Sequence, residues 1–371
     1  MKRKYKRLET PRRILLGPGP SNVPEEVSRA MSLPILGHLD PAFLSIMEEV
    51  QEMLRAVFMT KNRLTLPVSG TGSAGMEAAF VNIVEPGDSV LVCVNGVFGL
   101  RMCDIVERLG GVLHKVEADW GKPIDIQQVR DELGRCDARV VAVVHAETST
   151  GVLQPLEELS DIVHEKGALF IVDTVTSLSG APLKIDTWNI DVCYSGTQKC
   201  LSCPPGLAPI TFNDRALDKI ARRSTPVRSW YLDMTMVQKY WGADRVYHHT
   251  APINMIYALR EALRLILEEG LEARWERHLK NHLALVEGLE ELGLQLLVEK
   301  PYRIPMLNSV LVPEGVDEAI VRKRLLEEFS IEVGAGLGPL KGKILRIGIM
   351  GHSSTKENIE KLLSALKTIL S

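Results

Sequence analysis

The sequence lacks the features that would assign it to a membrane or nucleic-acid-binding class. No apolar run approaches the roughly 20 residues needed to cross a bilayer. The formal net charge is only −3 and the isoelectric point is about 6.3, so neither sign of charge is in the excess that favours nucleic acid or an anionic membrane as a partner. With 45% hydrophobic and 25% charged residues, the composition is that of an ordinary globular protein.

Cysteine is scarce, and its spacing indicates neither a disulfide framework nor a zinc site. Six cysteines in 371 residues, without regular pairing, favour reduced thiols and a cytoplasmic protein. Cys200 and Cys203 form a C-x-x-C directly after Lys199, but no second C-x-x-C or Cys/His cluster follows. We therefore expect no metal, and we interpret the pair as small buried side chains.

The N-terminus, MKRKYKRLETPRR, is strongly basic, and no apolar stretch follows it. This argues against a secretory signal. We expect residues 1–14 to form a solvated or subunit-wrapping arm, with a nucleic-acid or acidic-lipid arm as the alternative.

Strand and helix patterns alternate along most of the chain, which predicts an α/β fold with a largely parallel sheet. Short β-branched runs bounded by turn residues mark the strands, at 90–94, 139–145, 169–173, 191–195 and 207–212. Runs such as VVAVV show no polar alternation, so helices should cover both faces of the sheet.

Beyond Pro252 the pattern changes and predicts a second, smaller α+β domain. The helices expected in this domain are 254–269, 271–292, 316–328 and 354–370. Its expected strands are 308–313, 331–334 and 344–349. A prior of about 150 residues per domain also favours two domains. We divide the chain into an N-terminal arm (1–14), a large domain (15–253) and a small domain (254–371). The segment 224–250 is rich in Trp, Tyr and His, and we expect an ordered loop over a site there.

The segment SGTGSAG, residues 69–75, follows a strand pattern and opens a helix pattern. Glycines at a helix N-terminus let backbone N–H groups approach an anion, so this segment is a candidate phosphate cradle, with a plain tight turn as the alternative. Gly70, Gly72 and Gly75 also match the G-x-G-x-x-G of dinucleotide-binding folds. Those folds require an acidic residue at the end of the next strand, where this chain has Asn95.

An acid and a lysine follow two successive predicted strands. Asp173 ends the apolar strand LFIVD and is either a cap, a salt-bridged core acid, or the partner of a buried cation. Lys199 follows the next strand, DVCYS, with extension into solvent as its alternative. Open α/β sheets bind ligands at the carboxyl ends of their strands, so the two residues are candidates for one site. In enzymes that use pyridoxal 5′-phosphate (PLP), a lysine forms a Schiff base with the cofactor and an acid keeps the pyridine nitrogen protonated, which unites these features.

A series of ordered motifs strengthens this interpretation. They are LLGPGPSN (15–22), SGTGS (69–73), EPGD (85–88), HAETSTGVLQPL (145–156), VDTVTSL (172–178), YSGTQK (194–199), YHHTAP (247–252) and LRIGIMG (345–351). Through them the chain resembles, from Leu15 onward, the class V aminotransferases of fold type I, in particular the alanine–glyoxylate and serine–pyruvate aminotransferase branch. The resemblance implies a large domain with a mainly parallel, seven-stranded sheet between helices, a smaller C-terminal α+β domain, PLP as the cofactor, and a homodimer.

The resemblance also implies roles for the positions that match the family motifs. Lys199 would form the Schiff base and move the substrate proton, and Asp173 would pair with the pyridine nitrogen. The other positions expected to contact the ring or hold the phosphate are Thr71, Gly72, Ser73, Phe98, Thr148, Val175 and Gln198.

Further positions are implied for the substrate and the partner subunit. Arg346 would grip the substrate carboxylate with its two-pronged guanidinium, with a structural carboxylate as its alternative partner. Tyr247 and Thr250 are expected to reach the phosphate of the neighbouring subunit. The residues expected at the substrate entrance are those of the loop 17–20, including Gly19, and Asn22.

Two positions depart from the family pattern. Phe98 stands where the branch often has Trp, so ring stacking would persist over less area, and an ordinary core position is the alternative. Ser73 stands where the branch often has His, which keeps a hydroxyl donor to phosphate but loses a cation. We expect His248 and His249 to order their loop rather than to catalyse, because a lysine carries the proton in this family.

These inferences predict a ping-pong transaminase that passes the amino group of alanine or serine to glyoxylate or pyruvate. An (S)-ureidoglycine–glyoxylate aminotransferase is a close alternative, since it shares the architecture. A cysteine desulfurase would need a mobile cysteine on a late loop, and no cysteine follows Cys203. A nicotinamide-dependent oxidoreductase is the alternative from another class, and the missing ribose acid disfavours it.

Overall fold

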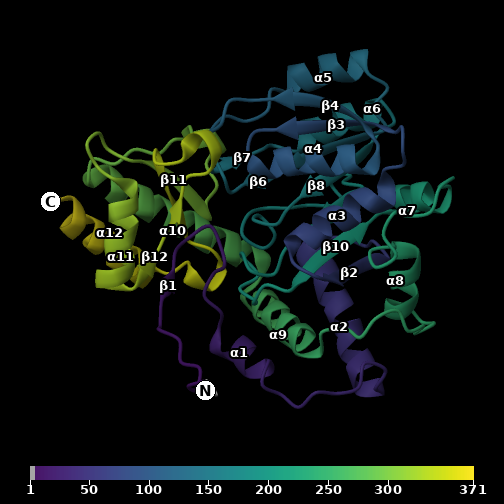
Figure 1. Ribbon diagram of the computed structural model, residues 1–371, viewed down its shortest axis with the longest axis horizontal. Coiled ribbons are helices and arrows are strands. Elements are labelled where there is room, and N and C mark those ends of the chain that lie inside the picture. Colours follow the sequence, from purple (N-terminus) through teal and green to yellow (C-terminus); the bar gives the residue numbers. More distant parts are fainter. Residues whose placement is uncertain (1–4) are drawn as a thin grey trace, which may run out of the picture.

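The computed structural model describes residues 5–371, which fold around two main hydrophobic clusters (Figure 1). The larger cluster belongs to the sheet and helices of the first part of the chain. The smaller cluster belongs to the C-terminal elements, drawn in light green and yellow at one end of the molecule.

The larger cluster is built on a seven-stranded sheet. In spatial order its strands are β2 (Leu64–Ser69), β10 (Leu207–Phe212), β9 (Val192–Tyr194), β8 (Leu169–Asp173), β5 (Val140–Val144), β3 (Ser89–Val94) and β4 (Val112–Glu117). β10 runs antiparallel to both of its neighbours, whereas the strands from β9 to β4 are parallel. The sheet is therefore mainly parallel, as the apolar runs predicted.

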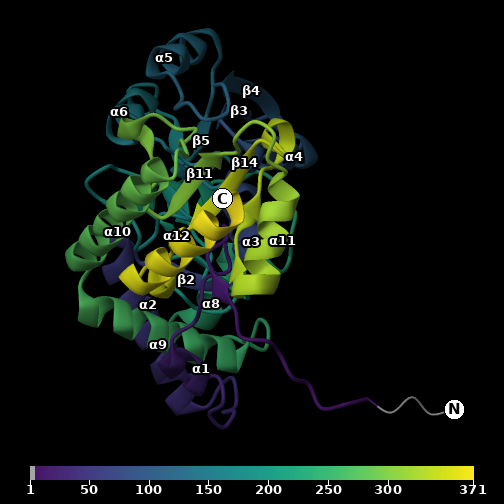
Figure 2. The ribbon, with the colours of Figure 1, turned by 90° about the vertical axis from the view of Figure 1, so that its left-hand side faces the viewer.

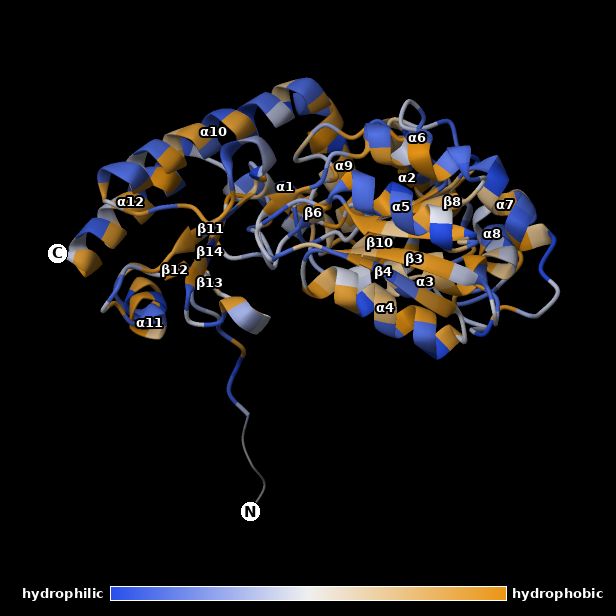
Figure 3. Cartoon of the chain, turned by 90° about the horizontal axis from the view of Figure 1, so that it is seen from above, coloured by the Kyte–Doolittle hydropathy of each residue, from blue (hydrophilic) through white to orange (hydrophobic). Residues whose placement is uncertain are grey.

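Helices cover both faces of this sheet, so the apolar central strands lie between two helical layers (Figure 3). The helices of this part are α1 (Glu25–Ala30), α2 (Pro41–Phe58), α3 (Gly72–Ile83), α4 (Val97–Leu109), α5 (Ile126–Arg135), α6 (Glu157–Glu165), α7 (Asp214–Ala221), α8 (Met234–Trp241) and α9 (Ile253–Glu269). Several begin at an Asp or Asn whose side chain accepts a first-turn N–H, namely Asp40, Asp125, Asn213 and Asp233. No helix among residues 5–371 is both long and apolar enough to span a membrane.

Part of the segment 224–250 is helical, so the prediction of a loop is wrong there. It contains α8, whose N-cap Asp233 accepts the N–H of Thr235. Tyr240 and Trp241 of this helix are buried in the larger cluster. The helix is only eight residues long, and its buried aromatic residues gave no clear helical period.

The smaller cluster is built on a three-stranded antiparallel sheet. Its strands, in spatial order, are β11 (Leu307–Leu311), β14 (Ile344–Gly348) and β13 (Gly334–Ala335), and its helices are α10 (Leu271–Glu291), α11 (Glu318–Phe329) and α12 (Lys356–Leu370). α9 packs in the larger cluster, although the sequence-based boundary assigns it to the smaller domain. That boundary stays a prediction.

The N-terminal segment joins the C-terminal core. β1 (Ile14–Leu15) pairs in parallel with β12 (Ile331–Glu332), and Leu16 is fully buried in the smaller cluster. In Figure 2 the purple N-terminal segment runs beside the yellow-green elements. Residues 1–4 of the expected arm lie outside the described residues. A short hairpin, β6 (Ala146–Glu147) and β7 (Val152–Leu153), follows β5 and completes the elements around the site.

Candidate active site

The ends of β8 and β9 bring Asp173 and Lys199 to the same edge of the sheet. Asp173 is the last residue of β8, is only 3% exposed, and pairs in register with Tyr194 of β9. Lys199 follows β9 after a short turn and is 7% exposed. Its Nζ donates a hydrogen bond to the carbonyl oxygen of Pro18 in the N-terminal loop. The two charged groups lie close enough for each to affect the pKa of the other.

Burial shifts the pKa values of both groups toward neutrality. For Lys199, burial is the largest effect, and with the positive charge of Arg346 it lowers the pKa of the amine to about 8. Burial raises the pKa of Asp173 to about 6, although the N–H of Val175, which donates to it at 2.8 Å, and the neighbouring Tyr194 hydroxyl act in the opposite direction. A buried amine and a buried acid with shifted pKa values at one place are characteristic of a catalytic site.

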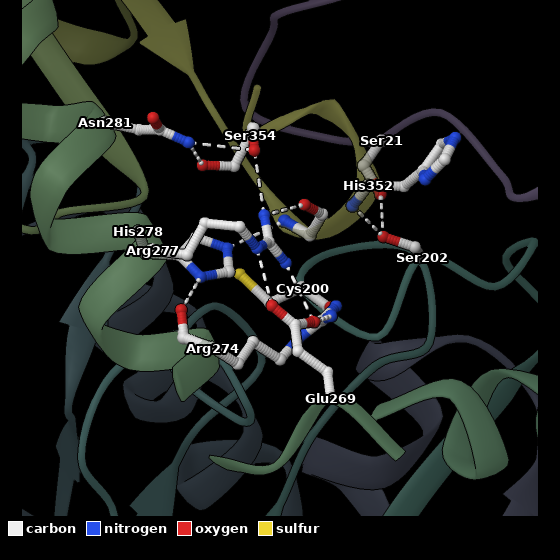
Figure 4. A network of polar contacts seen from close by, with 11 residues as sticks. Ser21, Cys200, Ser202, Glu269, Arg274, Arg277, His278, Asn281, His352 and Ser354 are labelled. Atoms are coloured by element: carbon white, nitrogen blue, oxygen red, sulfur yellow. Dashed lines mark hydrogen bonds and ion pairs between the residues drawn. The ribbon is translucent and has the colours of Figure 1, made fainter. Parts of the chain in front are cut away.

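A polar network holds the backbone around Cys200, the residue after Lys199 (Figure 4). Arg274, near the start of α10, donates to the carbonyl oxygen of Cys200 at 2.6 Å, and Ser21 donates to that of Lys199 at 2.8 Å. Glu269, the last residue of α9, forms an ion pair with Arg274. The position of the lysine therefore depends on α9, α10 and the N-terminal loop together.

The glycine segment forms the N-terminus of α3, where an anion was predicted. The N-cap Thr71 makes no side-chain capping bond, which leaves first-turn N–H groups for a ligand. A Cβ at Gly72 would lie 3.3 Å from Val175, so the backbone there is closely packed. A Cβ at Gly196 would lie 3.3 Å from Gly72 and 2.9 Å from the Oε1 of Gln198. That buried Oε1 has no hydrogen-bond partner within residues 5–371.

A buried carboxylate that sequence reasoning missed, Glu147, holds the backbone of Phe98. Glu147 is fully buried and accepts hydrogen bonds from the N–H of Phe98 at 3.1 Å and from the N–H and hydroxyl of Ser149 at 3.1 and 2.5 Å. The N-cap of α4, Gly96, has no side chain, and a Cβ there would collide with Glu147. The only signal in the sequence was an acid inside the motif HAETSTG, which does not reveal its distant partner.

Arg346 connects β14 to the β6–β7 hairpin. Its Nε donates to the carbonyl oxygen of Ala335 at 2.6 Å, and a terminal nitrogen donates to that of Thr148 at 3.1 Å. Burial lowers the pKa of Arg346 to about 10, and the negative charge of Glu147 opposes this shift. Arg346 forms no ion pair with a carboxylate in the described part of the chain, so the structural carboxylate considered above is not its partner.

The N-terminal loop places Gly19 directly against Lys199. Gly19 has a φ of +108°, and a Cβ there would lie 2.7 Å from the lysine side chain. Asn22 is tied to its own segment: its amide oxygen accepts the N–H of Leu15 at 2.8 Å, and its amide nitrogen donates to the carbonyl oxygen of Arg13 at 3.0 Å. Its expected place at the substrate entrance stays a prediction.

Tyr247 and Thr250 lie on the surface at the end of the aromatic segment. The Tyr247 residue is 57% exposed, and its hydroxyl lies 3.4 Å from that of Thr250. His249 forms a hydrogen bond with the Ser69 hydroxyl at 2.7 Å, and His248 stacks on a tryptophan ring with centroids 4.5 Å apart. The two histidines thus order this segment next to the glycine cradle.

Cys200 and Cys203 are buried free thiols. Burial raises the pKa of the Cys200 thiol to about 11, so it is protonated at pH 7. The group of possible metal ligands found among residues 5–371 consists of His114, Glu132 and Cys136, and it includes neither thiol of the C-x-x-C.

The fold agrees with comparisons to known proteins. The class V aminotransferase model matches residues 14–362. The chain belongs to this family. It is therefore an enzyme, an aminotransferase, and the predicted family and fold type are confirmed.

This aminotransferase is similar to proteins with two closely related activities. A crystal structure of alanine–glyoxylate aminotransferase from Nostoc sp. is 51% identical, with a TM-score of 0.98, covering 100% of this chain and 98% of that one. Ureidoglycine–glyoxylate aminotransferase from Bacillus subtilis is 44% identical, with a TM-score of 0.97, covering 98% and 94%. Alanine–glyoxylate aminotransferase from Callithrix jacchus is 44% identical over an alignment of 369 positions, which covers 98% of this chain and 89% of the relative.

Proposed function

We propose that this aminotransferase carries PLP on Lys199 and transfers the amino group of alanine or serine to glyoxylate or pyruvate in two half-reactions. The proposal depends on one observation: Lys199 is buried beside Asp173, and the pKa of its amine is lowered to about 8. A neutral amine can condense with an aldehyde, whereas a surface lysine is almost fully charged at pH 7.

The cradle fits the phosphate of PLP. The N–H groups at the N-terminus of α3, those of the N-cap Thr71 and of Gly72 and Ser73, provide donors at the positive end of the helix dipole. Gln198 has a buried amide oxygen without a partner within residues 5–371, and an amide can turn so that its nitrogen donates to phosphate. These residues would hold the phosphate end of the cofactor.

The neighbouring residues fit the ring. A protonated pyridine nitrogen is the cation that suits the buried carboxylate of Asp173, and bound PLP then acts as an electron sink for the substrate carbanion. Val175 and Phe98 are assigned to the two faces of the ring, and Thr148 to its phenolic oxygen. A Cβ at Gly72 would lie 3.3 Å from the Val175 side chain, so this apolar side chain lies next to the cradle, which supports the assignment.

Lys199 and Arg346 are the groups assigned to the substrate. The lowered pKa of Lys199 makes its amine a base that can take the substrate proton near neutral pH and return it. Arg346 forms hydrogen bonds only to carbonyl oxygens in the described chain, so its charge suits the carboxylate that every amino acid and oxo acid substrate carries. One such clamp serves both half-reactions. Gly19 lines the entrance beside the lysine.

We also propose that the active unit is a homodimer. Tyr247 and Thr250 are adjacent and exposed, so their hydroxyls can reach a neighbouring subunit. His249 anchors this segment to Ser69, next to the cradle, so the exposed pair has a defined position. In the dimer these hydroxyls would complete the phosphate site of the partner.

A reducing compartment such as the cytoplasm is the proposed location. All six cysteines are free thiols, and five of them are buried. Burial without pairing suits thiols that pack as small apolar side chains, and an oxidising compartment would not preserve them.

Ureidoglycine–glyoxylate transamination is the second candidate, because the relative from Bacillus subtilis is 44% identical across almost the whole chain. A donor–acceptor matrix separates the two. Alanine, serine and ureidoglycine are each assayed against glyoxylate and pyruvate with wild type, Lys199→Ala and Lys184→Ala. Lys184 is an exposed lysine between β8 and β9 and serves as the matched control.

We expect wild type to be fastest with alanine or serine, and Lys199→Ala to lose several orders of magnitude in turnover because nucleophile and base vanish together. Lys184→Ala should retain full activity. A dominant rate with ureidoglycine would favour the second candidate. A colourless wild-type protein that gains no visible absorbance with PLP would contradict the proposal.

A further inference from the structure

An arginine to which the family resemblance assigned no role lies at the phosphate cradle. Arg101, one turn after Phe98 on α4, donates from a terminal nitrogen to the Ser73 hydroxyl at 3.1 Å. Ser73 is in the first turn of α3, and its backbone N–H is one of those assigned to the phosphate. The guanidinium carbon of Arg101 also lies 5.0 Å from the centroid of the Phe98 ring. The exposed guanidinium thus contacts both the cradle and the Phe98 ring.

The charge of Arg101 is not neutralised locally. Within residues 5–371 it forms no ion pair with a carboxylate, whereas Arg108, two turns later on the same helix, pairs with Asp104 at 2.9 Å. A hydroxyl that accepts a hydrogen bond from a guanidinium keeps its own proton for another acceptor. Ser73 can therefore donate to a phosphate oxygen while Arg101 supplies positive charge behind it. A helix N-terminus carries only about half a charge, which a phosphate dianion exceeds.

We propose that Arg101 is the cation of the phosphate cradle, binding the cofactor phosphate through Ser73 or directly. Arg101 thus supplies from α4 a positive charge that the side chains of Thr71 and Ser73 do not carry. The contact with Phe98 restricts the guanidinium, so less conformational freedom is lost when an anion binds. The inference rests on the proposed function, since it concerns the phosphate of PLP.

The test compares PLP with pyridoxal, which has the same aldehyde and ring but no phosphate. Dissociation constants of both are measured by absorbance titration of cofactor-free wild type, Arg101→Gln, Arg101→Lys and Arg108→Gln. Arg108 is the matched control, because it lies on the same helix and its side chain is 74% exposed.

For Arg101→Gln we expect PLP affinity to fall about tenfold or more, as for loss of a charge-assisted contact. Pyridoxal affinity should change by less than about twofold, because no phosphate is involved. Arg101→Lys should lose less than Arg101→Gln, and Arg108→Gln should bind both ligands as wild type does. Added salt should narrow the PLP difference between wild type and Arg101→Gln.

Equal losses for PLP and pyridoxal would overturn the inference, because Arg101 would then act only through Phe98. Unchanged PLP affinity would overturn it as well. If Arg101→Gln does not fold, Ser73→Ala provides the same comparison, with a smaller loss confined to PLP. Wild type that binds neither ligand would instead refute the proposed function, so the two failures are distinguishable.

Discussion

At the scale of the residue, the site is defined by what burial does to two charges. Lys199 and Asp173 are almost fully buried, and burial moves the pKa of the amine down and that of the acid up. Each group therefore titrates closer to neutral pH than an exposed side chain of the same type. A buried acid that has no full ion pair is suited to a cationic ring nitrogen, and a buried amine near its pKa is suited to covalent and proton-transfer chemistry.

Cofactor loading should therefore accelerate with pH. The neutral amine is the nucleophile, and with a pKa of about 8 it is mostly charged below that value and mostly neutral above it. Mixing cofactor-free protein with PLP and following the visible absorbance between about pH 6 and pH 10 should give a rate profile that rises with a midpoint near the lowered pKa. A midpoint at the ordinary lysine value would contradict the assignment.

Gly19 offers a second test at this scale. A Cβ there would lie 2.7 Å from the Lys199 side chain, so Gly19→Ala should displace the amine and weaken PLP binding by about tenfold or more. Gly87→Ala is the control, since Gly87 also has a positive φ, +86°, but nothing lies within 4 Å of its Cβ position. Both variants carry backbone strain, and only the first should change the dissociation constant of PLP measured by fluorescence. Parallel losses would show that strain alone is responsible.

At the scale of the element, α4 begins with a cap that comes from another part of the chain. Gly96 has no side chain to cap the helix, and Glu147 and Ser149 of the hairpin region accept its first N–H groups instead. A carboxylate is favourable at a helix N-terminus, where the dipole is positive. Because Phe98 is in this first turn, the cap also sets the position of the aromatic ring.

Glu147→Gln should weaken PLP binding by about tenfold, since an amide cannot accept all the donors that converge on the carboxylate. The control is Asp191→Asn, another fully buried carboxylate, which accepts the Phe170 N–H at the opposite end of the strands. Both variants should lower the melting temperature, but only Glu147→Gln should change the PLP dissociation constant. Thermal unfolding and PLP titration of the two variants measure these effects. Equal PLP affinity of Glu147→Gln and Asp191→Asn would show that Glu147 contributes to stability and not to cofactor binding.

At the scale of the whole molecule, the site lies where the two cores meet. Glu269 is the last residue of α9, which packs in the larger cluster, and its carboxylate forms ion pairs with Arg274 and Arg277 of α10 (Figure 4). Helix α10 in turn packs in the smaller cluster. Arg277 also donates to the carbonyl oxygens of Gly351 and Ser354. The network therefore connects the helices of both cores to the segment that carries the lysine.

Glu269→Gln should reduce the free energy of unfolding by about 2 kcal/mol, because it leaves a mostly buried arginine without its partner. Glu268→Gln is the control, since the Glu268 side chain is 67% exposed and, among residues 5–371, forms an ion pair only with the partly exposed Arg264. Burial raises the pKa of Glu269, but Arg277 and Arg274 lower it more, so the folded state favours the ionised form. The stabilisation is then present above the ordinary glutamate pKa and lost as pH falls through the lowered one. Denaturant unfolding at neutral and acid pH measures this; no difference between the two variants would refute it.

Local patterns were enough to place the central strands and two key residues. The run LFIVD has the observed bounds of β8, and the end of that run marks Asp173 at the sheet edge. Helix α8 was not predicted because it is only eight residues long and its buried aromatic residues give no clear helical periodicity. The roles of Glu147, Arg101 and Arg274 were not predicted. Each side chain contacts a residue far away in the sequence, and no local pattern indicates such a pairing.

The sequence by itself determined the α/β class, the glycine cradle, and the acid and lysine at successive strand ends. These features depend on hydrophobic periodicity and on the residues that end helices and strands, which are properties of neighbouring residues. Only the tertiary structure decided that β1 joins the C-terminal core, that Glu147 caps α4, and that Arg101 donates a hydrogen bond to Ser73. It also decided the pKa values of Lys199 and Asp173. The physical reason is that burial and electrostatic fields arise from groups brought together by packing, wherever they stand in the chain.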